Sequence, residues 1–233
     1  MTGLSESRRL PHRLHRWSTQ KLGYEVAKRA IDVIISLAAI VILAPLLAAL
    51  CLLVRWTSPG PALFRQERLG RGSRPFTMLK LRTMRCGTSD ELHREFVTNL
   101  AASSGQAPSA GPRGLSKLET DPRVTPPGVW LRRMSLDELP QLFNVLAGKM
   151  SLVGPRPVLA WEAQLWPQTY PAYSHRFAVK PGLTGLWQVS GRGRLSVDEW
   201  IELDAEYVRR RGLGLDLLIL LRTGPALLSG GTA

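Results

Sequence analysis

A long apolar run interrupts the otherwise mixed pattern of hydrophobic and polar positions along this chain. It extends from Val33 to Val54, contains no charged residue, and has Ser36 as its only polar side chain. As a straight helix it would measure about 33 Å, which suffices for the roughly 30 Å core of a bilayer. A soluble core helix that is apolar on all faces over this length is unusual, and the run exceeds the about 7–15 apolar residues of a signal peptide. The pattern therefore predicts a segment that is inserted in a membrane.

Two features predict that this segment enters and leaves the membrane on the same side. Pro45 lies near its middle, lacks an N–H and places its ring against the carbonyl of Val41, although prolines also occur in spanning helices. Residues 1–29 contain seven basic and two acidic residues, a net charge of +5, and residues 55–85 contain eight and one, a net charge of +7. The positive-inside rule places both flanks in the cytoplasm. We expect a re-entrant hairpin broken at Pro45, with arms of about 12 and 9 residues, or roughly 18 and 14 Å.

Shorter periodicities predict the elements of the remaining chain. Residues 62–65 and 76–81 alternate like short strands around Gly70-Arg71-Gly72, which predicts a β-hairpin. Apolar residues at helical spacing predict a helix over 135–147 and an amphipathic helix from Val197 to Arg211.

The last apolar run extends from Leu213 to Leu228 and is interrupted by Asp216, Arg222 and Pro225. These interruptions make it too charged to span a membrane comfortably. We expect it to lie in the membrane interface, and a soluble core helix is the alternative.

Composition restricts the classes of protein that fit. A length of 233 residues suits one domain with appendages. The formal net charge of +13 favours anionic partners, namely nucleic acid, acidic lipid headgroups or phosphorylated substrates. An apolar content of 44% excludes a wholly disordered chain. Two cysteines, Cys51 and Cys86, exclude a disulfide framework and a four-cysteine zinc site, and the four histidines show no metal-ligand spacing.

The adjacent acids Asp137 and Glu138 are the first candidate for chemistry. In one interpretation they belong to a capping box, with Ser135 as the N-cap and Glu138 as its partner three residues later. In the other, one carboxylate is a nucleophile, the second assists it, and Arg132 and Arg133 hold a phosphate nearby. The two interpretations are compatible.

Several basic residues stand in segments that suit phosphate binding. Arg156 lies between Pro155 and Pro157, whose fixed φ stiffens the backbone for bidentate recognition, although a structural turn is equally consistent. Lys80 and Arg82 would share one face of a strand. The glycine-rich segments 181–185 and 190–194 let N–H groups approach an anion, but their spacing matches neither a P-loop nor a Rossmann fingerprint.

Taken together, these segments resemble the bacterial sugar transferases, the monotopic polyprenyl-phosphate hexose-1-phosphate transferases, over about residues 27–228. The strongest matches are the acid-pair block and the Pro-Arg-Pro block, which extend over residues 135–145 and 150–157. Further matches include Lys28-Arg29, Asp32, Pro45, residues 58–61, 64–70, 80–84, 121–123 and 180–192. The chain is similar to the short form, which has one re-entrant membrane helix.

The resemblance implies a reaction and roles for these residues. The family transfers sugar-1-phosphate from a UDP-sugar to a polyprenyl phosphate, such as undecaprenyl phosphate, and releases UMP. Asp137 would be the nucleophile that forms an aspartyl-phosphosugar intermediate, and Glu138 would assist it together with Mg²⁺. Arg156 would hold donor phosphate, Lys80, Arg132 and Arg192 match basic positions near the site, and Arg82 is a weaker match.

The resemblance also implies an organisation and a location. The expected fold is α+β and mainly helical, with a re-entrant helix-break-helix, a small β-hairpin and interfacial amphipathic helices. The expected parts are a basic mobile tail (1–20), a membrane hairpin (21–57) and a catalytic domain (58–233) that includes a flexible loop (101–114). The enzyme would work on the cytoplasmic face of the bacterial inner membrane, in contact with membrane lipid, and the sequence leaves a homodimer open.

Two other functions compete with this interpretation. One is a membrane-attached scaffold that has lost turnover, against which the intact Asp137-Glu138 pair argues. The other is a basic nucleic-acid-binding protein, which the charge allows, but the apolar run and the lack of a basic-aromatic nucleic-acid motif argue against it. We therefore expect no nucleic-acid partner.

Overall fold

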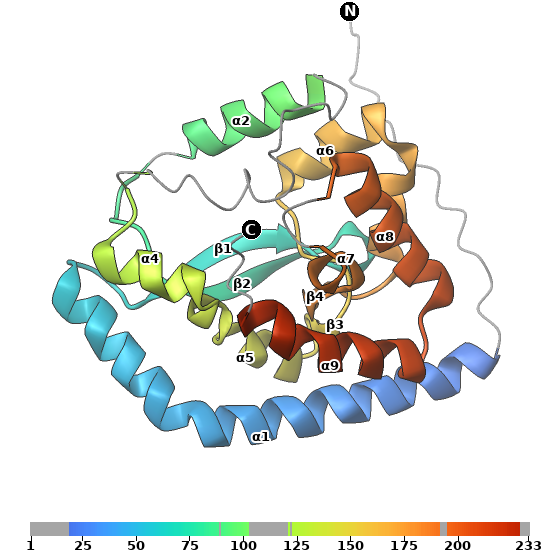
Figure 1. The fold of residues 1–233 in the computed structure, drawn as a ribbon, viewed down its shortest axis with the longest axis horizontal. Coiled ribbons are helices and arrows are strands. Elements are labelled where there is room, and N and C mark those ends of the chain that lie inside the picture. Colours follow the sequence, from blue (N-terminus) through green and yellow to red (C-terminus); the bar gives the residue numbers. More distant parts are fainter. Residues whose placement is uncertain (1–18, 89, 103–120, 122, 192–194, 229–233) are drawn as a thin grey trace, which may run out of the picture.

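The computed structural model describes residues 19–88, 90–102, 121, 123–191 and 195–228, of which residues 19–21, 92, 96, 100–102 and 228 are described by their backbone alone. Most of the predicted basic tail (1–20), most of the predicted flexible loop (101–114) and residues 192–194 lie outside the described residues. The fold is mainly helical, with one long apolar helix at the N-terminal side and small sheets of two strands each (Figure 1).

The apolar run forms most of α1 (Thr19–Thr57), a helix of 39 residues that continues through Pro45. α1 is the one helix in the described part that is long and apolar enough to cross a membrane. Figure 1 shows that it changes direction partway along and curves around the rest of the molecule. Pro45 explains a bend, because its ring displaces the preceding turn and its missing N–H cannot bond to the carbonyl of Val41. The helix is therefore continuous where the sequence predicted a break, and the re-entrant arrangement stays a prediction.

The N-terminal arm of α1 contacts the body of the protein through its few polar residues. Asp32, which is buried, accepts hydrogen bonds from the hydroxyl of Ser151 (3.1 Å) and the N–H of Leu152 (2.9 Å). Lys28 forms a 2.9 Å ion pair with Asp216. The opposite faces of α1 are apolar and exposed, as at the following positions: Leu22, Val26, Ile34, Leu37, Val41, Ile42 and Leu52. This division matches a helix with one side in lipid and a narrow polar stripe on protein.

The predicted hairpin is confirmed. β1 (Leu63–Leu69) pairs antiparallel with β2 (Pro75–Leu81), and the turn contains the short 3₁₀ helix η1 (Arg71–Ser73). Gly72 in this turn has φ of 66°, in the left-handed region that glycine occupies without strain. The hairpin places Lys80 near the end of β2, next to the acid pair.

The helix predicted over residues 135–147 is divided in two. α4 (Pro126–Arg133) ends before Ser135, then the acids form the 3₁₀ turn η2 (Leu136–Glu138), and α5 follows (Gln141–Leu146). Ser135 has φ of 55° and makes no side-chain capping hydrogen bond, so the predicted capping box is wrong. The left-handed backbone of Ser135 changes the direction of the chain before η2. Pro140, which lacks an N–H, lies between η2 and α5.

The second half of the chain completes the body around a parallel pair of strands. β3 (Ser151–Val153) pairs with β4 (Gly182–Thr184). The helices of this half and α2 are bounded as follows: α2 (Glu91–Ala102), α6 (Ala160–Thr169), η3 (Pro171–Ala178), α7 (Leu186–Val189), α8 (Val197–Arg210) and α9 (Leu213–Leu228). The amphipathic helix predicted from Val197 is confirmed as α8, which begins with a capping box between Ser196 and Glu199.

The C-terminal run is helical as expected, and its polar residue faces inward. Asp216 of α9 is buried, where it accepts hydrogen bonds from Tyr24 (2.8 Å) and Tyr207 (2.9 Å) in addition to the ion pair with Lys28. Leu217 and Leu221 of the same helix are exposed. α9 lies beside the N-terminal arm of α1 (Figure 1). The interfacial position of α9 stays a prediction, and its exposed leucines agree with it.

Candidate active site

A cavity of about 1090 Å³ opens between the β-hairpin and the helices of the second half. Asp137, Glu138, Lys80 and Arg156 line it, so the structure brings together four residues that the sequence predicted for the site. The C-terminal part of α1 also reaches the cavity through Cys51 and Arg55, as do residues of α6, α7 and α8 on the other side. The cavity is large enough for a nucleotide-sugar.

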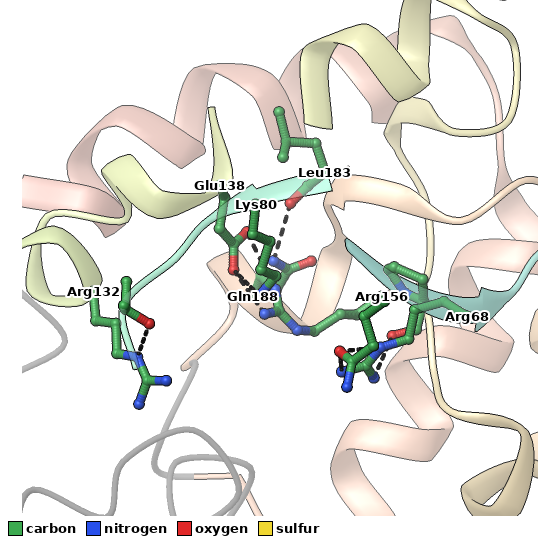
Figure 2. Close-up of polar contacts among 10 residues, drawn as sticks. Arg68, Lys80, Arg132, Glu138, Arg156, Leu183 and Gln188 are labelled. Carbon is green, nitrogen blue, oxygen red and sulfur yellow. Dashed lines mark hydrogen bonds and ion pairs between the residues drawn. The ribbon is translucent and has the colours of Figure 1, made fainter. Parts of the chain in front are cut away.

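Glu138 is held by two cations. Its carboxylate accepts hydrogen bonds from the two terminal nitrogens of Arg156 at 2.7 and 3.3 Å, and Lys80 Nζ lies 3.6 Å from Oε1 (Figure 2). Glu138 raises the pKa of Arg156, so the guanidinium stays charged. Burial lowers the pKa of Lys80, an effect that Glu138 opposes. The site is therefore a cluster in which one carboxylate contacts two cations.

Asp137 differs from its neighbour, because its carboxylate has no ion pair or hydrogen bond with another residue in the described part of the chain. It is buried, and its side chain reaches the cavity. Burial raises the pKa of Asp137 above its ordinary range, while the charges of Lys80, Arg156 and Arg132 oppose that shift. A buried carboxylate with no partner among the described residues suits a nucleophile better than a structural group.

Arg132 stands on the other side of Glu138 from Arg156 (Figure 2). Its Nε donates a 2.8 Å hydrogen bond to the hydroxyl of Thr83. Burial lowers the pKa of Arg132, and Asp137 counteracts this. Glu138 therefore has an arginine on each side, and the charges of both arginines act on Asp137.

Arg82 occupies a different environment from Lys80. It is buried, and its guanidinium donates to the carbonyls of Ser58 (2.8 Å) and Pro59, at the point where the chain leaves α1. Lys80 and Arg82 were predicted to share a strand face, but β2 ends at Leu81. Although Arg82 also lines the cavity, its contacts favour a role in fixing the end of α1. Its predicted contact with substrate stays a prediction.

The loop that carries Arg156 is positioned by close backbone packing. A Cβ on Gly182 would lie 2.1 Å from the nitrogen of Gly154, so only glycine lets β4 approach the segment before Pro155. Arg176, itself in a buried 2.9 Å pair with Asp204, donates a 3.0 Å hydrogen bond to the carbonyl of Arg156. In the described structure, Gly182 therefore allows β4 to pack closely against Gly154.

Sequence reasoning missed a second polar group in the cavity. Glu162 of α6 lies 3.2 Å from His93 of α2 and 3.7 Å from Arg68 of β1. These residues are far apart in the chain, so no spacing signal could have joined them. Arg192, in contrast, was predicted for the site and lies outside the described residues.

The acid pair fits Mg²⁺ in the way this ion is usually held. Mg²⁺ typically takes one or two carboxylates and completes its coordination with substrate phosphate and water. Asp137 supplies a buried carboxylate that is not committed to another described residue, and Glu138 adjoins it. Among the described residues, no group of three or more His, Cys, Asp or Glu forms a metal site made by protein alone.

Comparison with known proteins identifies the family of this chain. A family model described as bacterial sugar transferase matches residues 23–230. The exopolysaccharide production protein ExoY of Sinorhizobium fredii is 39% identical over 201 residues, which cover 86% of this chain and 85% of the relative. The UDP-glucose:undecaprenyl-phosphate glucose-1-phosphate transferase of Caulobacter vibrioides is 41% identical over 218 residues, or 91% and 74% of the two chains. The undecaprenyl-phosphate galactose phosphotransferase of Salmonella typhimurium is 38% identical over 201 residues, or 86% and 40%.

Proposed function

The chain belongs to the bacterial sugar transferase family, and from this premise we propose that it transfers sugar-1-phosphate from a UDP-sugar to undecaprenyl phosphate. The reaction would be a membrane step of polysaccharide synthesis on the cytoplasmic face. The observation that carries the proposal is the buried, uncommitted carboxylate of Asp137 beside a Glu138 that holds two cations. The names of the Caulobacter and Salmonella relatives support the donor and acceptor classes.

In the first half of the reaction, a carboxylate oxygen of Asp137 attacks the β-phosphorus of the donor. The bond from this phosphorus to the bridging oxygen of UMP breaks, and UMP leaves with the bonding electrons. Arg156 and Lys80 bind the donor phosphates and stabilise the negative charge that spreads over the transferring group. The sugar phosphate is then joined to Asp137 as an acyl phosphate.

In the second half, an oxygen of the polyprenyl phosphate attacks the same phosphorus. The bond to Asp137 breaks, the carboxylate is regenerated, and polyprenyl diphosphate-sugar leaves. UMP and the acceptor phosphate use the same position opposite Asp137, because each displacement is in line. Arg132, on the side of Glu138 away from Arg156, would bind a phosphate there.

We further propose that Mg²⁺ is bound by Asp137, Glu138 and the donor phosphates. When bound, the ion neutralises charge on the transferring phosphoryl group. The remaining roles belong to this chain's own residues: Glu138 holds Lys80 and Arg156 in place, and the buried walls limit access of water to the intermediate.

The membrane arrangement also follows as a proposal. α1 bends partway along, its N-terminal arm is fixed to the body by Lys28 and Asp32, and its C-terminal end borders the cavity through Cys51 and Arg55. A helix that enters and leaves the cytoplasmic leaflet keeps both of these ends with the same body. The acceptor phosphate would then meet Asp137 at the depth of the headgroups.

The bend predicts a topology change in a proline variant. Pro45→Ala restores the N–H and is expected to straighten α1, so that part of the molecules place the N-terminus across the membrane. A cysteine introduced at position 10, with Cys51 and Cys86 replaced by alanine, can be probed with a membrane-impermeant maleimide from the outer side. We expect position 10 to be labelled in the Pro45→Ala variant only. Leu46→Ala, a truncation of the neighbouring side chain, is the matched control and should stay unlabelled. Equal protection of position 10 in both variants would contradict the role of Pro45, and labelling of position 10 in the protein that keeps Pro45 would contradict the re-entrant arrangement.

The proposed activity is tested by incubating the full chain with a panel of UDP-sugars, Mg²⁺ and undecaprenyl phosphate. We expect UMP release with at least one donor, together with a lipid-linked sugar diphosphate. A membrane-attached scaffold would release no UMP from any donor, and that result would overturn the proposal.

A further inference from the structure

The cavity extends past Arg156, away from the end of α1. Arg68 follows Arg156 on the side opposite Glu138 (Figure 2), and its guanidinium lies 3.4 Å from the carbonyl of Pro157. The following residues line this part of the cavity, which we call the aromatic end: Arg68, His93, Glu162, Trp166, Trp187 and Gln188. The aromatic end is therefore adjacent to the phosphate-binding arginine and lies on the side away from the membrane helix.

Glu162 supplies fixed hydrogen-bond acceptors at the aromatic end. Its Oε2 accepts the N–H of Leu159 at 2.7 Å, and its Oε1 lies 3.2 Å from His93 Nε2. Burial opposes ionisation of Glu162, but the contacts with His93, Arg68 and Leu159 outweigh burial and hold its pKa below the ordinary range. The carboxylate is thus charged at neutral pH, and each of its oxygens has a further lone pair for a ligand.

A wall of indole rings completes the aromatic end. Trp166 lies four residues after Glu162 in α6, so both side chains share one face of that helix. The ring of Trp200 packs at 6.0 Å from Trp166 and at 6.0 Å from Trp187, measured between centroids. The rings present flat apolar surface beside a charged carboxylate.

Two buried polar atoms on this wall lack a partner in the described structure. They are the indole N–H of Trp187, a donor, and the amide oxygen of Gln188, an acceptor. Both side chains are more than nine-tenths buried, with exposed fractions of 6% and 7%. A buried donor or acceptor without a partner costs about 1–3 kcal/mol, so these atoms point to a ligand that carries both donors and acceptors.

We propose that the aromatic end binds the glycosyl group of the donor, with Glu162, His93, Trp187 and Gln188 as the residues that recognise its hydroxyls. This inference rests on the proposed function. Hydroxyl groups both donate and accept hydrogen bonds, as the mixed set of partners requires, and the C–H faces of a sugar ring suit a flat indole wall.

The order of the two displacements separates the glycosyl group from the nucleotide. UMP leaves from, and the lipid acceptor arrives at, the position opposite Asp137, which must therefore communicate with the membrane. The end of the cavity beside Cys51 and Arg55 of α1 meets this requirement. The glycosyl group stays on the enzyme through both displacements, so it suits the end that is closed by α6, α7 and α8.

The experiment compares two donors, UDP-glucose and UDP-galactose, which differ only at C4 of the sugar. It also measures inhibition by UMP, which has no sugar. Trp187→Phe keeps a ring but removes the N–H, and Gln188→Met removes the amide oxygen. Either variant is expected to change the ratio of kcat/KM for the two donors by about fivefold, which corresponds to one hydrogen bond. The inhibition constant of UMP should stay within about twofold of the wild-type value. Trp130→Phe, on α4 and outside the cavity lining, is the matched control.

The outcomes separate this inference from the proposed function. If the wild type turns over both donors and neither variant changes the ratio, the glycosyl assignment is overturned while the transferase activity stands. A weaker UMP inhibition in the variants with an unchanged donor ratio would assign the aromatic end to the nucleotide instead, and would also overturn it. If the wild type releases no UMP from any donor, the proposed function itself fails. Thermal melting identifies a variant that does not fold, in which case the donor ratio of the other variant tests the glycosyl assignment.

Discussion

Asp137→Asn is expected to reduce UMP release by at least about a thousandfold, which corresponds to roughly 4 kcal/mol of transition-state stabilisation. The amide is nearly isosteric with the carboxylate, so the buried turn η2 should keep its shape. Its oxygen and nitrogen are poor nucleophiles, and no acyl phosphate can form on them. The rate is measured as UMP release from the preferred UDP-sugar.

The same variant tests the covalent intermediate directly. With a donor labelled in its sugar, the wild type without acceptor should retain label on the denatured protein, and Asp137→Asn should not. Asp198→Asn, an exposed aspartate at the start of α8, is the matched control and should behave as wild type. Label that persists in Asp137→Asn would show that another residue is the nucleophile, and undiminished turnover would exclude the mechanism.

Arg156→Ala is expected to lower kcat/KM by about a hundredfold to a thousandfold. The substitution removes the bidentate partner of Glu138, at 2.7 and 3.3 Å, and the cation that we assign to the donor phosphate. Losing one preorganised donor to a developing oxyanion costs this much in other enzymes. Arg156→Lys keeps the charge but not the planar fork, so we expect it to recover only part of the loss.

The control for this prediction is another arginine that is paired with a glutamate. Arg210 of α8 forms a 2.5 Å pair with Glu206, but its side chain is 72% exposed. Exposed pairs contribute little to stability, so Arg210→Ala should leave kcat/KM within about twofold. Wild-type activity in Arg156→Ala would remove Arg156 from the site, and full recovery in Arg156→Lys would show that charge alone is required.

Local patterns in the sequence were sufficient for elements that depend on near neighbours. The alternation around Gly70-Arg71-Gly72 predicted the hairpin, and the apolar periodicity from Val197 predicted α8. The acid pair, Lys80 and Arg156 were predicted one by one, and the structure brings them together. For the hairpin and α8 the determining interactions lie within one strand pair or one helix, whereas the contacts of Lys80 and Arg156 with Glu138 form only in the folded protein.

The features that sequence reasoning missed depend on distant contacts. Nothing local reveals that Ser135 takes a left-handed conformation, which replaces a helix N-terminus by the turn that presents Asp137. Arg82 contacts the carbonyl of Ser58 after α1 because β2 ends at Leu81, one residue before it. The pair of His93 and Glu162 forms only when α2 packs on α6. These outcomes are set by tertiary packing, which periodicity does not encode.

The end of the bent helix forms part of the cavity wall, at Cys51 and Arg55, and this has a kinetic consequence. If the lipid acceptor reaches Asp137 by moving along the membrane plane past this wall, its relevant concentration is its mole fraction in that plane. Adding inert detergent or lipid at a constant amount of acceptor should then slow the second half-reaction by surface dilution. The first half-reaction, which draws on a water-soluble donor, should keep its rate. The rate of the first half-reaction would thus depend on the donor concentration in the solution volume, and that of the second on the acceptor concentration in the membrane plane.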